Sequence, residues 1–300
     1  MKAQEEAFMP HHPSHVAIIA NTGLGDALWM MVIAQNFARQ GHRVVLYNDF
    51  LIHLQPLFPW VTVNKYPAEI APLFALFDKI IIQQHAPGSK MSEYPAHVEL
   101  IYKKDLALDK TFALNMHEVS KSLLSPAPCS MDIGLQIPVN WLFRAYSRRV
   151  VIHPLSANAW KNWPAAKFIA LAKKLQQDGF SPQFILPPIE LAEWKARLQT
   201  EGLNKPLALD WMNLTQFIYE SGYYIGNDAS TGHLASSLWI PTLSIFDRKS
   251  RSLLLKPSWG PNLIIRPPAI LFGRALIKAL WKRCLSVGRV YRAFMTLSRS

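Results

Sequence analysis

Residues 21–28, with the sequence NTGLGDAL, place two glycines and a carboxylate directly after the apolar run 16–20. A glycine turn between a strand and a helix often binds a nucleotide phosphate, but the dinucleotide fingerprint needs a third glycine where this chain has Leu28. Asp26 would also repel a phosphate from the helix N-terminus. Two interpretations stay open. Asp26 caps the helix, or it is a general base held at the floor of a cleft, where Gly23 and Gly25 let a substrate approach.

A second glycine turn, over residues 223–236, has small and hydroxylated side chains where a helix begins. The backbone N–H groups of such a turn can hold a diphosphate. The candidate ligand-binding residues are Asp228, Ser230, Thr231, Gly232 and His233. An ordinary capped turn between a strand and a helix remains the alternative.

A third loop lies within residues 150–164 and offers Ser156, Asn158 and Lys161. The proline at 164 suits the first position of the helix that follows. Lys161 is a mobile cation that could bind a phosphate, although a loop lysine can also be merely solvated.

Strand-like and helical patterns alternate along the chain, which predicts an α/β fold with parallel sheets. The expected strands are 16–20, 43–47, 79–82, 111–114, 149–153, 182–186, 207–209, 223–226, 241–246 and 262–266. The expected helices are 26–41, 164–178, 188–200, 213–221 and 229–238. Residues 134–148 have no clear period and predict a linker. Two sets of alternating strands and helices, one on each side of this linker, indicate two Rossmann-like domains that face a cleft.

The net charge of +12 is confined to one end of the chain. Residues 248–300 hold 12 of the 32 Lys and Arg and no acid, so residues 1–247 are balanced at 20 of each sign. A nucleic-acid partner would rest on this charge alone, without any recognised motif, and is not expected. Two cysteines, no secretory leader and no apolar run long enough to span a bilayer predict a cytoplasmic protein. His11, His12 and His15 are interpreted as incidental, so no metal site is expected.

Taken together, the three loops resemble glycosyltransferase family 9, the ADP-heptose:lipopolysaccharide heptosyltransferases. Three motifs match, in the family's order. They are Gly25-Asp26, the two-part motif of residues 153–156 (HPLS) and 161–164 (KNWP), and residues 226–235 (GNDASTGHLA) followed by Ile240-Pro241-Thr242. Each motif is weak alone, but three in order over residues 16–268 are specific.

The resemblance implies a GT-B architecture and an inverting, metal-independent transferase. It implies an acceptor-binding domain over 1–140 and a nucleotide-sugar-binding domain over 149–268. Asp26 would be the catalytic base, with Gly23 and Gly25 in the acceptor-side loop. The expected co-substrate is ADP-heptose, and no further cofactor is implied. The nucleotide sugar would be held by Ser156, Asn158, Lys161, Asp228, Ser230, Thr231, Gly232 and His233. The implied acceptor is an anionic glycolipid or lipopolysaccharide precursor.

Three departures from the family pattern concern donor choice. Thr215 and Gln216 follow Leu214 where an acid usually holds the ribose. Residues 229–230 are Ala-Ser where Ser/Thr-Gly is usual, and Asp247 replaces a glycine. Two alternatives therefore stay open. The chain could use another nucleotide sugar for an O-antigen or capsule, or it could bind a sugar nucleotide or glycolipid without catalysis.

Residues 270–300 are predicted to form a basic C-terminal helix. One helical stripe is expected to carry Arg274, Lys278, Lys282, Arg289, Arg292 and Arg299. The helix is expected to pack back on the N-terminal domain, to contact the anionic inner face of the inner membrane, or both.

Overall fold

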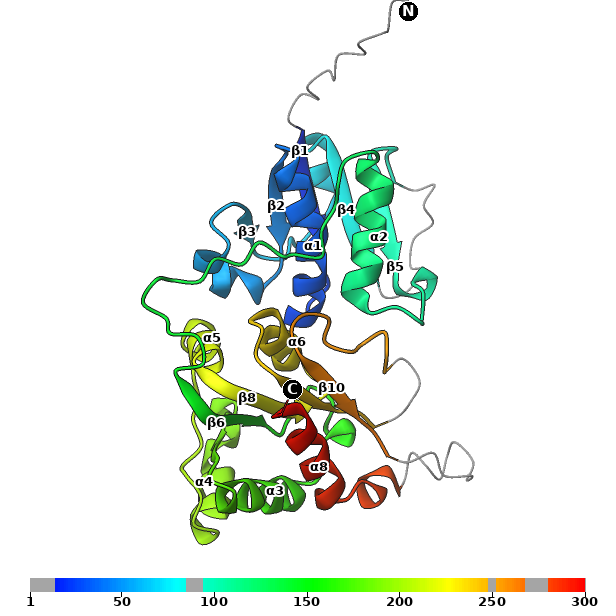
Figure 1. Cartoon of the computed structure of the whole chain (residues 1–300). Coiled ribbons are helices and arrows are strands. Elements are labelled where there is room, and N and C mark those ends of the chain that lie inside the picture. Colours follow the sequence, from blue (N-terminus) through cyan, green and yellow to red (C-terminus); the bar gives the residue numbers. More distant parts are fainter. Residues whose placement is uncertain (1–13, 85–93, 248–251, 268–279, 300) are drawn as a thin grey trace, which may run out of the picture.

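The computed structural model describes residues 14–84, 94–247, 252–267 and 280–299. Figure 1 shows two α/β bodies stacked on one another, each built around a parallel sheet. Both sheets have five strands, in the orders β3-β2-β1-β4-β5 and β10-β9-β8-β6-β7. The predicted α/β class with two Rossmann-like domains is therefore confirmed.

The first sheet is centred on β1, whose apolar residues pair in parallel with β2 and β4. The chain turns from β1 into α1, which is buried along most of its length because almost every face carries apolar side chains. The elements of this body are β1 (His15–Ile19), α1 (Leu24–Arg39), β2 (Arg43–Tyr47), β3 (Thr62–Asn64), β4 (Lys79–Gln84), β5 (Val98–Tyr102) and α2 (Phe112–Leu124).

The second sheet places β6 and β8 side by side, so their carboxyl ends deliver two loops to one edge. The elements are β6 (Tyr146–His153), α3 (Ala165–Gln177), β7 (Ser181–Phe184), α4 (Leu191–Thr200), α5 (Trp211–Tyr219), β8 (Ser221–Asn227), α6 (Ser230–Ser237), β9 (Thr242–Ile245), β10 (Asn262–Ile265) and α8 (Val287–Leu297).

The predicted strand at 111–114 is wrong, the one at 207–209 is reduced to a single bridge between Leu207 and Ile185, and two strands were not predicted. Residues 111–114 begin α2, where the Thr111 hydroxyl accepts a hydrogen bond from the backbone N–H of Leu114 at 3.3 Å. A threonine cap followed by apolar residues imitates a short strand in sequence, because alternation over four residues cannot distinguish the two. The missed strands are β3 and β5; β5 provides the edge beside β4 in place of 111–114.

The C-terminal segment also differs from the prediction. Within residues 280–299 the helix is interrupted before α8, where the Ser286 hydroxyl accepts from the N–H of Arg289. Instead of lying on the N-terminal domain, α8 packs on α3 and the second sheet. Its Phe294 ring lies 5.0 Å from that of Phe180. This position follows from its apolar face, which completes the second domain's core. Residues 270–279 of the predicted helix lie outside the described residues.

The two bodies meet where α1 crosses α6 (Figure 1). One apolar cluster runs through this contact, with Leu28 and Met31 on one side and Leu234 and Ala235 on the other. A backbone hydrogen bond also joins the two bodies. The N–H of Phe112 donates to the carbonyl of Leu254 at 2.9 Å. The contact therefore fixes the first glycine turn relative to the second.

Candidate active site

The first turn places Asp26 in the opening turn of α1. The helix begins at Leu24 with Gly23 as its N-cap, so Asp26 does not occupy the cap position itself. The amide Nε2 of Gln83 donates to the Asp26 carboxylate at 3.2 Å. A Cβ on Gly23 would lie 2.9 Å from the same carboxylate, so this glycine leaves room for it. The helix dipole also favours a negative charge here.

Gln83 is a site residue that the sequence did not indicate. It is the penultimate residue of β4 and is 4% exposed, and its Oε1 accepts from the N–H of Asn21 at 3.1 Å. One amide therefore holds both the turn and the carboxylate. A polar residue at the carboxyl end of a buried strand beside β1 was the available signal.

The second turn is anchored to the third loop by Asn227. Its side chain is fully buried, accepts from the N–H of Trp163 at 3.0 Å and donates to the carbonyl of Pro154. The two loops therefore form one unit at the edge of the second sheet. Sequence reasoning quoted this asparagine in its motif but did not give it a role.

Lys161 and Asp228 form an ion pair across these two loops, with 3.1 Å between Nζ and Oδ2. The predicted phosphate-binding lysine is thus held against the acid of the second turn. Ser156 donates to the side-chain oxygen of Asn162 at 2.7 Å, whereas the side chain of Asn158 is exposed. The structure brings these predicted residues together on one side of the site.

Thr231 faces inward. Its hydroxyl lies 2.6 Å from the hydroxyl of Tyr224 and 3.2 Å from Nδ1 of His153. Burial lowers the pKa of His153 to about 4, so this imidazole is neutral at physiological pH. This buried network fixes the start of α6, and the Thr231 side chain serves as an anchor there.

His233 is buried at the contact between the two bodies. It is 3% exposed, and its ring meets that of Trp29 edge-on at 4.9 Å between centroids. A Cβ on Gly25 would lie 3.3 Å from His233 and 3.6 Å from the hydroxyl of Ser230. The glycine therefore allows the Asp26 turn to approach the start of α6 closely.

Burial also lowers the pKa of His233 to about 4, partly opposed by the charge of Asp228. Its Nδ1 has no hydrogen-bond partner in the described part of the chain. Lys103 approaches from the other body, with its Nζ 5.2 Å from the ring of Phe112 and 6.0 Å from that of Trp29. This lysine was not indicated by any sequence pattern.

Thr215 and Gln216, where the resemblance would place a ribose-binding acid, form hydrogen bonds within the chain. The hydroxyl of Thr215 is buried and donates to the carbonyl of Trp211 at 2.6 Å. The amide of Gln216 donates to Glu220 at 2.9 Å. Gly232 is closely packed, since a Cβ there would lie 3.4 Å from the hydroxyl of Ser244.

No group of three or more potential metal-binding side chains occurs among the residues that the structure describes. Within the same residues, none of the helices combines the length and the apolar character needed to cross a bilayer.

Two α/β domains, each built around a parallel five-stranded sheet, define a GT-B-type fold. A family model for glycosyltransferase family 9 (heptosyltransferase) matches residues 100–265. The chain belongs to this family, and its predicted membership and GT-B fold are confirmed. No curated protein matches the chain in sequence.

Solved structures agree with this assignment at the level of the fold. A family 9 glycosyltransferase from Veillonella parvula DSM 2008 matches with a TM-score of 0.72 and 14% identity, over 96% of this chain and 98% of that one. ADP-heptose lps heptosyltransferase II from E. coli matches with a TM-score of 0.72 and 13% identity, over 95% and 98%. E. coli heptosyltransferase WaaC with ADP gives 0.70 and 14%, over 94% and 99%.

Proposed function

We propose that this chain is an inverting, metal-independent glycosyltransferase that transfers heptose from ADP-heptose to a lipopolysaccharide core or related glycan. The observation that carries the proposal is the close approach of two turns across the domain boundary. Gly25, next to Asp26, lies against Ser230 and His233 at the start of α6. The family assignment and the structure of a heptosyltransferase with ADP support a nucleotide-sugar donor.

In this proposal the first body binds the acceptor and the second binds the donor. Asp26 takes a proton from the acceptor hydroxyl, whose oxygen then attacks the anomeric carbon as the bond to the diphosphate breaks. The nucleoside diphosphate leaves with the electron pair of that bond, so it needs charge stabilisation. Lys161 and the N–H groups at the start of α6 would supply it. Ser156, Asn158 and Asp228 would complete the donor site.

The Asp26→Asn variant tests the role of the base. The amide keeps the shape but cannot accept the proton, so turnover should fall about 10²-fold or more while donor binding is retained. ADP release from ADP-heptose with an acceptor glycan measures the rate, and calorimetry measures donor binding. Asp109→Asn, at an exposed site in the same body, is the control. Full turnover in Asp26→Asn would refute the assignment of the base.

A second candidate donor follows from the ribose position. Thr215 and Gln216 offer no carboxylate to an adenosine ribose at that place, and their side chains already bond within the chain. A same-family transferase that uses another nucleotide sugar for an O-antigen or capsule is the alternative. Thermal shifts with ADP, UDP, GDP and their sugars distinguish the two. No response to any nucleotide would favour a non-catalytic glycolipid-binding protein.

We further propose a peripheral location on the inner face of the inner membrane. The support is the acid-free C-terminal segment, in which Arg283, Arg292 and Arg299 are exposed. Because α8 contributes to the core, the test replaces these three arginines by glutamine and leaves the segment intact. Reduced binding to anionic vesicles is expected, because three cations are removed; unchanged binding would remove this role from the tail.

A further inference from the structure

The loop that carries Lys161 is short and irregular. Lys161 lies in a single 3₁₀ turn, Ala159–Lys161, and one turn of this kind closes few hydrogen bonds. Its N–H donates to the carbonyl of Asn158 at 2.9 Å, and the N–H of Asn162 donates to that of Ala159 at 3.1 Å. Such a loop needs contacts from other segments to keep one conformation.

A segment near the end of the chain supplies such contacts. We call residues 280–285, which contain the helical turn before α8, the C-terminal clasp. The carbonyl of Leu285 accepts from the indole N–H of Trp163 at 3.0 Å and from Nζ of Lys167 at 2.8 Å. Lys167 also donates to the carbonyl of Lys282 at 2.5 Å. A lysine is well suited to the last carbonyls of a helical turn, which have no partner within the turn.

The clasp contacts the loop on both sides of Lys161. Before this lysine, Nζ of Lys282 donates to the carbonyl of Ala159 at 3.4 Å. After it, the buried Trp163, which bonds the clasp through its indole, also donates its backbone N–H to Oδ1 of Asn227 at 3.0 Å. The clasp, the loop and the second glycine turn are therefore connected through one residue.

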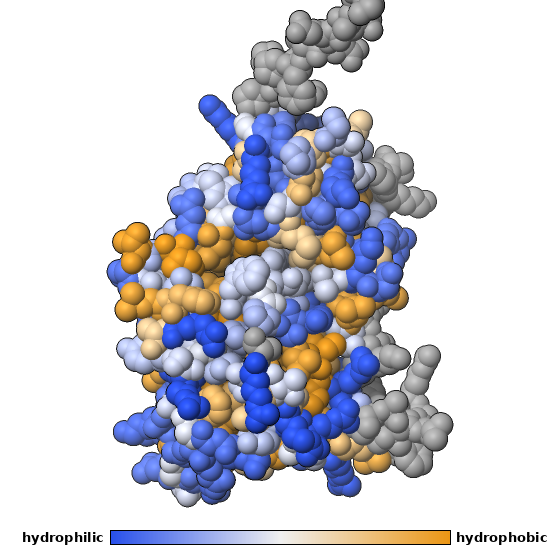
Figure 2. Space-filling view, in the orientation of Figure 1, coloured by the Kyte–Doolittle hydropathy of each residue, from blue (hydrophilic) through white to orange (hydrophobic). Residues whose placement is uncertain are grey.

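The clasp itself is fixed to the second body. Trp281 and Leu285 are buried in the same apolar cluster as Phe168 of α3. The ring of Phe168 meets that of Trp163 edge-on, with 5.0 Å between the centroids. On the face shown in Figure 2, hydrophilic side chains gather over α8, which continues the chain after the clasp, while its apolar residues belong to the core. The segment is therefore an anchored support for the loop.

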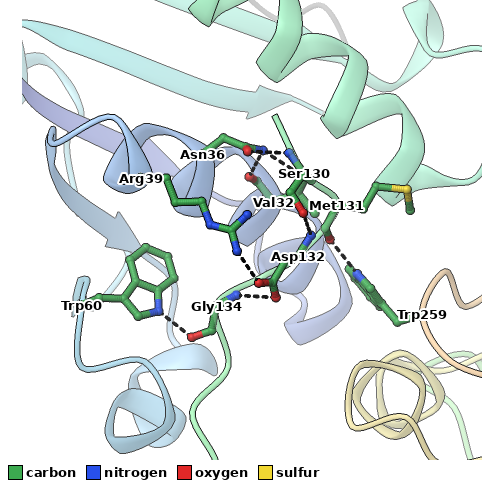
Figure 3. A network of polar contacts seen from close by, with 9 residues as sticks. All are labelled: Val32, Asn36, Arg39, Trp60, Ser130, Met131, Asp132, Gly134 and Trp259. Carbon is green, nitrogen blue, oxygen red and sulfur yellow. Dashed lines mark hydrogen bonds and ion pairs between the residues drawn. The ribbon is translucent and has the colours of Figure 1, made fainter. Parts of the chain in front are cut away.

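The two bodies are joined by contacts that involve other residues, as Figure 3 shows. The side chain of Asn36, on α1, and the backbone of Ser130 exchange two hydrogen bonds of 2.8 Å. From the second body, the indole N–H of Trp259 donates to the carbonyl of Met131 at 2.9 Å. A change in the clasp should therefore alter the loop and leave the arrangement of the bodies, and with it Asp26, in place.

We propose that the C-terminal clasp positions the donor-binding loop, with Trp163 and Lys167 as the positioning residues. They act through Lys161, whose ammonium is held beside Asp228, where it can meet a diphosphate. A loop that is already fixed loses less conformational entropy when a ligand binds. Loss of the clasp should therefore raise the KM for the donor and leave kcat at saturating donor unchanged. The inference rests on the proposed function for the identity of the ligand, and it adds residues 280–285 to the elements on which donor affinity depends.

Lys167→Met tests the clasp in the full chain, because the methionine keeps an unbranched side chain but cannot donate to the carbonyls. Its affinity for a nucleoside diphosphate, measured by calorimetry with ADP, UDP and GDP, should fall about ten-fold, since a charged hydrogen-bond donor is lost. Lys167→Arg keeps the charge and the donors and should restore most of the affinity. Lys174→Met is the matched control, because Lys174 lies on the same helix and contacts α8 at the ring of Tyr291, 4.4 Å from its Nζ. Its donor affinity should equal that of the unchanged chain.

Trp163→Phe tests the second positioning residue, because it removes the indole N–H and keeps an aromatic ring in the core. Donor affinity should fall about five-fold, as expected for one lost hydrogen bond. Trp194→Phe, at a 4% exposed position in the same apolar cluster, is the control for the lost volume. Both variants should lose stability to urea, but only Trp163→Phe should lose donor affinity. This difference separates positioning from a merely structural role.

Amide hydrogen exchange reports on the loop without any ligand. In Lys167→Met the N–H groups of Lys161, Asn162 and Trp163 should exchange about ten-fold faster than in the unchanged chain, because the loop opens more often, whereas those of α1 should not change.

Unchanged donor affinity in Lys167→Met would overturn the inference, as would an equal loss in Lys174→Met or a fall in kcat with the KM for the donor unaltered. If the unchanged chain binds none of the three nucleotides, the proposed function fails. The exchange rates then decide the role of the clasp, and equal rates in Lys167→Met and the unchanged chain would overturn it.

Discussion

At the scale of single residues, one buried amide contributes to the placement of the Asp26 carboxylate. Gln83→Met keeps the volume but removes the donor to Asp26 and the acceptor for the N–H of Asn21. An unsatisfied buried N–H costs about 1–3 kcal/mol, so we expect the free energy of unfolding to fall by that amount. We also expect turnover to fall, because the carboxylate loses a contact that orients it. Urea unfolding and ADP release measure the two effects.

The neighbouring position provides the control for Gln83. Gln84→Met removes a 3.4 Å contact to the hydroxyl of Tyr94 at the end of the same strand, away from Asp26. It should leave turnover unchanged. Equal loss of turnover in both variants would contradict a specific role for Gln83.

His233 makes the stability of the molecule depend on pH. Burial lowers its pKa to about 4, below the 6.5 of a free imidazole, so the unfolded chain binds this proton first. The neutral His233 side chain therefore contributes about 3 kcal/mol to the free energy of unfolding. This contribution is fully present above pH 6.5 and is lost as the pH falls toward 4. His153 titrates in the same window.

Unfolding of the His233→Gln variant by urea at a series of pH values measures this contribution. The loss of stability between pH 6.5 and 4 should be smaller than in the unchanged chain, because one of the two neutral imidazoles is gone. His53→Gln, at an exposed position, should retain the full pH dependence. An unaltered slope in His233→Gln would show that the residue titrates normally.

At the scale of elements, the crossing of α1 and α6 sets the separation between the two halves of the site. Gly25→Ala places a methyl group 3.3 Å from the ring of His233 and 3.8 Å from the Cα of Ser230, so the helices must move apart by tenths of an ångström. We expect turnover to fall about ten- to a hundred-fold, since small misplacements are costly in catalysis. Steady-state kinetics with separate donor binding should show the loss in kcat.

A helical glycine elsewhere is the matched control for this crossing. A Cβ on Gly288 in α8 meets nothing closer than 3.7 Å, at the mobile end of Arg292. Gly288→Ala should raise the free energy of unfolding by about 0.5–1 kcal/mol and leave turnover unchanged. Comparable kinetics of the two variants would mean that the crossing does not position the site.

At the scale of the whole molecule, α8 belongs to the second domain. Phe294 is fully buried between the rings of Phe180 and Tyr223. Phe294→Ala should lower the free energy of unfolding by about 3–5 kcal/mol, as expected for a large aromatic side chain in a core. Thr296→Ala, exposed on the same helix, should have little effect. Chemical unfolding measures both, and a small loss in Phe294→Ala would mean that α8 is only loosely attached.

The C-terminal segment therefore has two roles that sequence alone did not separate. Its apolar face completes a core, and its exposed arginines remain available to a charged partner. The domain boundaries at 140, 149 and 268, and the role of each predicted site residue, stay predictions that the experiments above test.

The sequence by itself determined the local features of this protein. The apolar runs predicted most strands, the glycine turns predicted where helices begin, and three motifs in order indicated the family. These signals are local because they depend on side-chain period and backbone freedom. The same locality explains the wrong strand at 111–114, where a capped helix start and a strand have the same pattern over four residues.

Only the tertiary structure decided which residues meet. Three pairs of contacting residues lie dozens of residues apart in the sequence, and no period along the chain relates them. The pairs are Gln83 with Asp26, Gly25 with His233, and Lys161 with Asp228. Their contacts follow from the order of strands in two sheets and from the packing of α1 on α6. The burial of Thr231 and His233 depends on the same packing. The attachment of α8 to the second domain depends on its contacts with α3 and the second sheet.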